Sequence, residues 1–522
     1  AMQKQSQRAL ANNAGTSDLF KSMFSFSWAQ SLFGLKQLGG LLTPGRAAEE
    51  FEQIAKPTEA ELDESVRNFF RVGDRIQRET IDALSGGRTS PARRGNGSAA
   101  PNQPAPSGVP PARPSPSAPA YPVNSGSLNT SSFVVLGEGL AAGMGDFTLS
   151  EVTQRESFPA QMARQMQTDF SQALIQEPGI CYPIGFTRPP VLVPQPLQST
   201  VFDRIPPVPV RNLSVPGLRI KEALELRPVQ PLIRRDSHKL TALNLTLGVL
   251  HIARGEEKTL SQLEYALECC PTFVVICLGY SEALEAAASG NPDTLPRAES
   301  LRSDYARILT PLREAGVEVL TLTIPDPFDT PYFSTLSAAS KILMVEPSIV
   351  RQLYGIGDEA LITVHGLNEI GFQLFGKNVG PLPENATLNV EVGQQISGRI
   401  AELNDALSSV SRECGARIYD LCAFLRRLKS EGVNTGARKL TAEYLGGFYS
   451  LNGYYPGATG HAVIANELLH TLNISYRSDF PQINLDAVQQ SDPVAAYKPA
   501  QGPCWTMDTL PRAQAVPAAT SA

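Results

Sequence analysis

The stretch "SFVVLGEGLAAGMGDF", residues 132–147, decides the fold, because it joins a buried strand to a glycine-rich turn. The run "SFVVL" is apolar without alternation, which is typical of a strand buried on both faces of a parallel sheet. The following turn "GEGLAA", residues 137–142, matches the dinucleotide fingerprint G-x-G-x-x-A. The first hypothesis is therefore a loop that binds a nucleotide cofactor.

The residues after the turn disfavour a cofactor. A dinucleotide fold needs a second strand ending in Asp or Glu about 20 residues after the glycines, because this acid binds the ribose hydroxyls. Here "SEVTQRESFPAQMARQMQTDF", residues 150–170, has a helical period, and the acid in range, Glu156, precedes a helix. We therefore expect no cofactor.

Strand, loop and helix then recur in the same order. The blocks that show it are "NLSVPGLRIKEAL" (212–224), "TFVVICLGYSEAL" (272–284), "VEVLTLTIPDPFDTPYF" (317–333) and "FYSLNGYYPGATGHAVIANELL" (448–469). This order predicts an α/β fold with an open parallel sheet, covered on both faces and carrying its chemistry at the carboxyl ends of the strands.

In these blocks, residues 132–475 resemble the SGNH (GDSL-type) hydrolase family. The resemblance implies a three-layer flavodoxin-like fold and a functional site made from four blocks. The first block of the family supplies a serine nucleophile, whose backbone N–H also faces the oxyanion. The second supplies a glycine N–H and the third an asparagine amide. The last block, D-x-x-H, supplies the base and the carboxylate that orients it.

The first three blocks depart from the family pattern. Gly139 stands at the nucleophile position, and Glu138 replaces the aspartate before it. The glycine of the second block is present as Gly217, whereas Ser281 stands where the asparagine belongs. Since glycine has no side chain, no acyl-enzyme can form at residue 139 by the family's route.

The last block departs as well. "SLNGYYP" puts Asn452 in place of the aspartate and Tyr455 in place of the histidine. A phenol has a pKa near 10 and is therefore a poor base at neutral pH. Because the histidine is absent, no imidazolium forms that a side chain at residue 452 would have to stabilise. We therefore expect that no catalytic set is intact and that the domain is a pseudo-esterase.

The former cleft is expected either to hold a small ligand or to be filled and inert. Two tyrosines would offer flat stacking area and hydroxyl donors to an acyl, sugar or ester group. The candidate ligand-binding residues are Glu138, Gly139, Gly217, Tyr280, Ser281, Asn452 and Tyr455.

Relocated catalytic residues are the alternative. Ser281 is the best candidate for a relocated nucleophile, although hydrogen bonding of Ser281 to a neighbour is the simpler interpretation. His365 is the best candidate for a relocated base, because it lies in an insertion that can cover the cleft. His461 lies six positions beyond the family's histidine, inside a helix, and is expected to be structural. No spacing typical of a metal site occurs, so we expect no metal.

The flanking regions differ in composition. Residues 1–84 predict an amphipathic helical module, which begins a second helix at the capping box "TEAE" (58–61). Its apolar faces need a partner: self-association or docking through residues 20–84, or adsorption to a lipid or polymer surface. Residues 85–131 form a Pro/Gly/Ser-rich linker, predicted to be disordered, and residues 476–522 an extended tail.

Bulk properties exclude some classes. The net charge of −6 over 522 residues does not favour a nucleic-acid binder. Seven cysteines without a C-x-x-C pair predict buried thiols rather than a disulfide framework. No apolar run reaches the length of a transmembrane helix, and no leader is visible, which favours a cytoplasmic or peripheral location.

Three hypotheses for function remain. The leading one is a catalytically inactive SGNH-like domain that acts in ligand binding, scaffolding or assembly. The second is an active serine-type ester hydrolase with relocated residues. The third is targeting to a surface or an assembly through the N-terminal helices.

Overall fold

The structure is a computed structural model that describes residues 122–146, 148–176, 179–181, 209–229, 238–254, 259–376, 379–436, 438–492 and 495. The predicted helical module with its capping box, most of the predicted linker and the end of the predicted tail lie outside the described residues.

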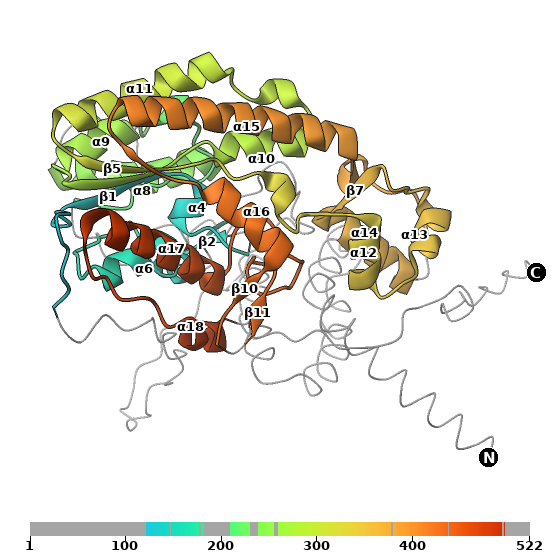
Figure 1. Ribbon diagram of the computed structural model, residues 1–522. Helices are drawn as coiled ribbons and strands as arrows, with labels where there is room; N and C mark the ends of the chain where they lie inside the picture. Colours follow the sequence, from blue (N-terminus) through green and yellow to red (C-terminus); the bar gives the residue numbers. More distant parts are fainter. Residues whose placement is uncertain are drawn as a thin grey trace, which may run out of the picture.

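A four-stranded parallel sheet forms the centre of this body (Figure 1). Its strands, in spatial order, are β1 (Phe133–Gly137), β4 (Phe273–Cys277), β5 (Glu318–Leu322) and β9 (Arg417–Tyr419). All five residues of β1 and of β4 are buried, as expected for interior strands covered on both faces. The prediction of an α/β fold with a parallel sheet is confirmed.

A further segment lies along the free edge of β1. The N–H of Val135 donates to the carbonyl of Arg211 at 2.9 Å, and the N–H of Leu213 donates to the carbonyl of Val135 at 3.0 Å. Val135 and Asn212 are thereby paired in parallel. The spatial order is therefore this segment, then β1, β4, β5 and β9.

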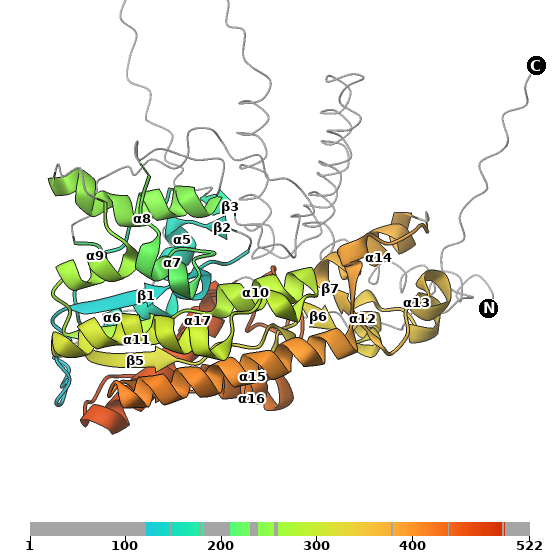
Figure 2. The same cartoon turned by 90° about the horizontal axis from the view of Figure 1, so that it is seen from above.

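Helices cover both faces of the sheet (Figures 1 and 2). One face carries α6 (Phe158–Gln165) and α17 (Ala458–Tyr476), and the other carries α9 (Gln262–Glu268), α11 (Ala298–Glu314) and α15 (Val390–Glu413). The sequence of α11 explains its placement, because its buried residues Leu301, Tyr305, Ile308 and Leu312 recur at helical spacing on one side.

An insertion between β5 and α15 packs its own small core beside the body (Figure 2). Its antiparallel sheet has the order β6-β7-β8. Its elements are β6 (Phe333–Ser334), α12 (Leu336–Leu343), α13 (Pro347–Tyr354), β7 (Ala360–Thr363), α14 (Val364–Gly376) and β8 (Thr387–Asn389).

The remaining elements are short or peripheral. They are α4 (Gly139–Ala142), β2 (Thr148–Leu149), α5 (Glu151–Arg155), β3 (Ile180–Cys181), α7 (Ile220–Glu225), α8 (His238–Arg254), α10 (Tyr280–Ser289), α16 (Leu421–Glu431), β10 (Val433–Asn434), β11 (Lys439–Leu440) and α18 (Leu485–Ser491), with the 3₁₀ turns η1 (Pro292–Thr294), η2 (Pro327–Asp329) and η3 (Glu384–Ala386). In the part of the chain that the structure describes, no helix combines the length and the apolar character needed to span a bilayer.

The packed body extends beyond the expected boundaries at 132 and 475. Leu128 is buried before β1, although the composition around it is that of a linker. After α17, Phe480, Ile483 and Val488 are buried, and Val488 belongs to α18. Isolated apolar residues among polar ones give no periodic signal in the sequence. Each of them nevertheless covers apolar surface of the body, and this burial stabilises the folded state.

Candidate functional site

The predicted site residues after β1 and β4 meet at the carboxyl ends of these strands. Gly137 and Cys277 end the two strands side by side, and Glu138 and Ser281 follow them. Ser281 Oγ donates a hydrogen bond of 2.9 Å to Glu138 Oε2. The other carboxylate oxygen, Oε1, accepts from the N–H of Leu140 at 3.1 Å, so Glu138 caps the short helix α4.

Tyr455 completes this cluster from the opposite end of the sequence. Its hydroxyl donates to Glu138 Oε2 at 3.3 Å, and its side chain is fully buried. A Cβ added at Gly139 would lie 2.3 Å from Tyr455 Oη and 2.6 Å from Cζ. The tyrosine ring thus occupies the space into which a side chain at the nucleophile position would extend.

Asn452 and Tyr280 hold the tyrosine loop in place. Asn452 Oδ1 accepts from the backbone N–H groups of Tyr454 (3.0 Å) and Tyr455 (2.9 Å). Tyr280 donates from its hydroxyl to the carbonyl of Tyr454 at 2.8 Å and meets the ring of Tyr455 edge to face, 5.9 Å between centroids. The side chain of Asn452 therefore shapes a backbone turn.

The structure brings six of the seven candidate residues together, and Gly217 lies in the turn that precedes α7. Gly217 has a φ of +74°, which favours glycine. The six clustered residues are buried, whereas Gly217 is partly exposed. The six clustered residues are therefore not accessible to solvent.

Burial governs the protonation of this cluster. It raises the pKa of Glu138 to about 7, and hydrogen bonds from Leu140, Ser281 and Tyr455 offset only part of this effect. A second carboxyl, Glu282, accepts from the N–H of Ile220 at 2.7 Å and has its pKa raised to about 7 by burial, with a contribution from the charge of Glu138. Near neutrality, both carboxyls are thus poised between their neutral and charged forms.

The neighbouring phenol and thiol are not activated. Burial raises the pKa of Tyr280 and of Cys277 well above their ordinary values, and the charge of Glu138 raises both further. At neutral pH the two groups remain protonated and are poor nucleophiles.

The two histidines considered from the sequence do not complete a catalytic set with Ser281. The Ser281 hydroxyl bonds to a carboxylate, while His365, on α14, has a buried Nδ1 without a hydrogen-bond partner and a pKa lowered by burial. His461, on α17, accepts at Nδ1 from the N–H of Phe158 at 3.3 Å, and burial lowers its pKa to about 3. His461 is thus a neutral imidazole at the interface of α6 and α17.

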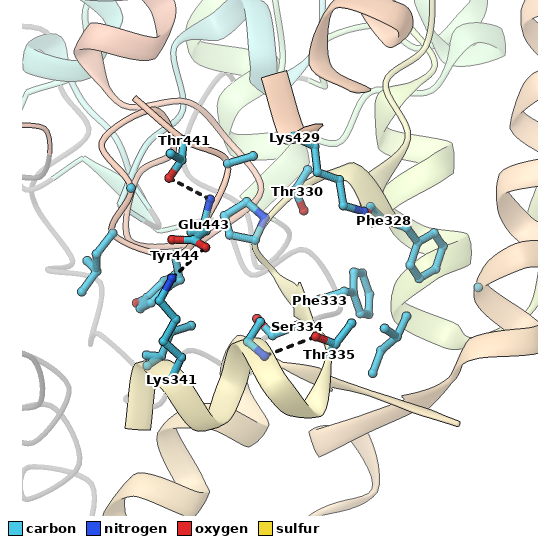
Figure 3. Close-up of a pocket in the computed structure, with 18 of the residues that line it drawn as sticks. Phe328, Thr330, Phe333, Ser334, Thr335, Lys341, Lys429, Thr441, Glu443 and Tyr444 are labelled. Atoms are coloured by element: carbon cyan, nitrogen blue, oxygen red, sulfur yellow. Dashed lines mark hydrogen bonds and ion pairs between the residues drawn. The ribbon is translucent and has the colours of Figure 1, made fainter. Parts of the chain in front are cut away.

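A cavity that the sequence did not signal lies between the body and the insertion (Figure 3). Its volume is about 660 Å³, and Phe328, Phe333, Lys341, Lys429 and Tyr444 are among its lining residues. None of the seven candidate residues lines it. Its walls come from separate segments without a common motif, so no local pattern in the sequence indicates it.

Comparison with known proteins adds no family. Neither a protein-family model nor a curated protein sequence matches this chain. Within the described residues, no three His, Cys, Asp or Glu side chains gather as metal ligands would. The side-chain geometry therefore carries the functional argument.

Proposed function

We propose that the α/β body is an SGNH-like domain that does not hydrolyse esters and acts instead in ligand binding, scaffolding or assembly. The observation that carries this proposal is the position of Tyr455, whose ring fills the space above Gly139. A substrate carbonyl has no attacking group at residue 139, and no room beside it.

The spatial order of the sheet supports the SGNH-like part of the proposal. The segment at Asn212, then β1, β4, β5 and β9, corresponds to the strand order 2-1-3-4-5 of flavodoxin-like doubly wound sheets. Glu138 and Ser281 follow β1 and β4 at their carboxyl ends, where such folds carry their sites. This arrangement supports an SGNH-like frame whose catalytic residues are replaced.

The charge arrangement supports the loss of hydrolysis. Ester cleavage by this route needs a base that takes the proton of a nucleophile and donors that face the oxyanion. At the position of the base, Tyr455 is itself a hydrogen-bond donor to Glu138, and Asn452 uses its carbonyl oxygen on backbone N–H groups. The cluster is thus arranged for cohesion rather than for proton transfer.

One observation favours the second candidate, an active hydrolase. Ser281 Oγ lies 2.9 Å from a carboxylate whose pKa is about 7, which is the spacing of a nucleophile and its base. Against it stands burial, because Ser281 is only 5% exposed and Glu138 is not exposed at all. Buried in this way, the hydroxyl is not accessible to an ester in the present arrangement.

A fluorophosphonate probe distinguishes the two candidates. The full chain is incubated with the probe beside an active serine esterase as positive control, and the modified residues are mapped by mass spectrometry. We expect no adduct at any serine of residues 132–475. We also expect the wild type to hydrolyse p-nitrophenyl butyrate no faster than the Ser281→Ala variant does. An adduct at Ser281, lost in Ser281→Ala, would establish the hydrolase instead.

A further inference from the structure

The cavity between the body and the insertion has the size of a small-molecule site. Its volume of about 660 Å³ falls within the range of roughly 300–1,000 Å³ typical of ligand pockets. Its walls are the loop after β5, the strand β6 with helix α12, the start of α15 and the chain around β11. Both the insertion and the body thus contribute to it.

One end of the cavity is apolar. The rings of Phe328 and Phe333 lie 4.6 Å apart between centroids, and Leu361 of β7 is beside them. On α15, Gly393 faces the same place, since a Cβ added there would lie 3.2 Å from Phe328 Cε1 and 3.5 Å from Leu361 Cδ1. The absence of a side chain at residue 393 keeps the aromatic wall close to the helix.

The lining as a whole carries an excess of positive charge. Among the described lining residues there are four cationic side chains, Lys341, Lys429, Arg438 and Lys439, and one carboxylate, Glu443. Figure 3 shows Lys341 with Glu443 on one side of the cavity and the two phenylalanines on the other.

The cations differ in how firmly they are held. Lys429 donates to the carbonyl of Phe328 at 2.6 Å and pairs with Asp329 at 3.4 Å. Lys341 pairs with Glu443 at 3.2 Å, but both side chains are largely exposed, so this pair is weak and easily exchanged. Lys439 is exposed and forms no ion pair with any described residue.

We propose that this cavity binds a small amphiphilic anion, with its apolar part against Phe328 and Phe333 and its acidic group toward Lys341 and Lys439. The acidic group is a carboxylate or a group of similar charge and size. A neutral or cationic ligand would leave the excess of positive charge uncompensated. This inference rests on the proposed function, because it assigns a class of ligand to a domain proposed to bind one.

Matched eight-carbon ligands test the charge requirement on the full-length protein. Octanoate, 1-octanol and octyltrimethylammonium share a chain length and differ in head group, and each is titrated by isothermal calorimetry at low salt. We expect octanoate to bind about tenfold more tightly than 1-octanol and octyltrimethylammonium not to saturate. Equal binding of all three, or no binding of octanoate, would overturn the proposal.

Two adjacent positions of α12 test the location. Ala338 lines the cavity and is half-buried, whereas its neighbour Ser337 is exposed and does not line it. Ala338→Trp is expected to abolish octanoate binding, and Ser337→Trp, which adds the same bulk outside, to leave it within twofold. Equal effects of the two variants, with circular dichroism confirming that both fold, would place the ligand elsewhere.

The double variant Lys341→Gln/Lys439→Gln tests the acidic group separately. Because both side chains are exposed, the variant is expected to fold as the wild type does. Octanoate binding should weaken about tenfold while 1-octanol binding is unchanged. A loss of both to the same degree would contradict the assigned orientation. These titrations involve no ester. A failure to bind octanoate would therefore contradict the anion site alone, whereas a fluorophosphonate adduct would contradict the proposed loss of hydrolysis.

Discussion

Gly139→Ala tests the filled cleft most directly, because it adds one carbon atom where Tyr455 lies. Gly139 is the first residue of α4 and does not have a positive φ, so the backbone itself accepts alanine. The added Cβ would lie 2.3 Å from Tyr455 Oη and 2.6 Å from Cζ, far inside any non-bonded contact. Either the ring or the helix must move.

The expected loss of stability in Gly139→Ala follows from the contacts that hold the Tyr455 ring in place. Tyr455 is fully buried and packs against Tyr280 and Tyr454, with 5.9 and 5.0 Å between ring centroids. Overpacking of such a site costs about 1–3 kcal/mol. Weakening the hydrogen bond to Glu138 adds about 1 kcal/mol, and the lower flexibility of alanine in the unfolded chain returns about 0.5–1 kcal/mol. We expect a net destabilisation of about 1–3 kcal/mol.

Urea unfolding followed by circular dichroism at 222 nm measures this difference. The matched control is Gly398→Ala on α15, where an added Cβ meets no atom within 4 Å. This control is expected to stabilise the protein by about 0.5–1 kcal/mol, since it removes a glycine from a helix interior.

A double-mutant cycle identifies the ring as the cause. Tyr455→Leu removes most of the colliding atoms, so Gly139→Ala should cost at least about 1 kcal/mol less in that background than in the wild type. If the two changes add within about 0.5 kcal/mol, or if Gly139→Ala alone leaves the urea midpoint unchanged, Tyr455 does not fill the cleft and the reasoning fails.

The remaining predictions concern protonation and packing. Between about pH 4.5 and 7, the folded protein keeps protons on Glu138 and Glu282 that the unfolded chain has released, because both pKa values are raised to about 7. The free energy of unfolding should therefore fall as the pH rises through this window. Glu138→Gln should flatten the dependence of the urea midpoint on pH, and an unchanged slope would contradict the assignment. Asp492 accepts from the backbone and the hydroxyl of Thr459, each at 2.8 Å, so Asp492→Ala should destabilise the start of α17 by about 1–3 kcal/mol. Calorimetry checks it, and an unaltered melting temperature would show that the segment after Tyr476 does not support the body.

The sheet could be predicted where the chain is buried on both faces. The runs 133–137 and 273–277 are apolar without alternation, and their burial follows directly from their composition. The edge strand β9 was missed, since it has three residues, begins with the exposed Arg417 and offers no apolar run. Its place is fixed by pairing with β5, a tertiary effect that a local pattern does not contain.

The site was predicted as a set of positions but not as a geometry. The sequence placed Glu138 and Ser281 after strands, at their carboxyl ends. The structure shows that these strands are neighbours and that the two side chains are joined by a hydrogen bond of 2.9 Å. The direction of the Tyr455 side chain depends instead on Tyr280, Tyr454 and the turn held by Asn452. Whether the cleft was open or filled therefore could not be read from the residue types, which were compatible with both.

The packing of Tyr455 against Gly139 is also a reason why single substitutions should not introduce an active SGNH-type site. A serine at residue 139 needs the space that Tyr455 occupies, so Gly139→Ser meets the same collision as Gly139→Ala before any nucleophile is aligned. Tyr455→His frees the space of Oη but replaces the phenol hydroxyl that donates to Glu138 by a shorter imidazole, which does not reach the position of Oη. Glu138 is a buried carboxyl whose pKa is already raised by burial. Each change is thus unfavourable alone and becomes tolerable only beside the other. Coupling of this kind stabilises the present arrangement, in which Gly139, Tyr455 and Glu138 form one packed unit.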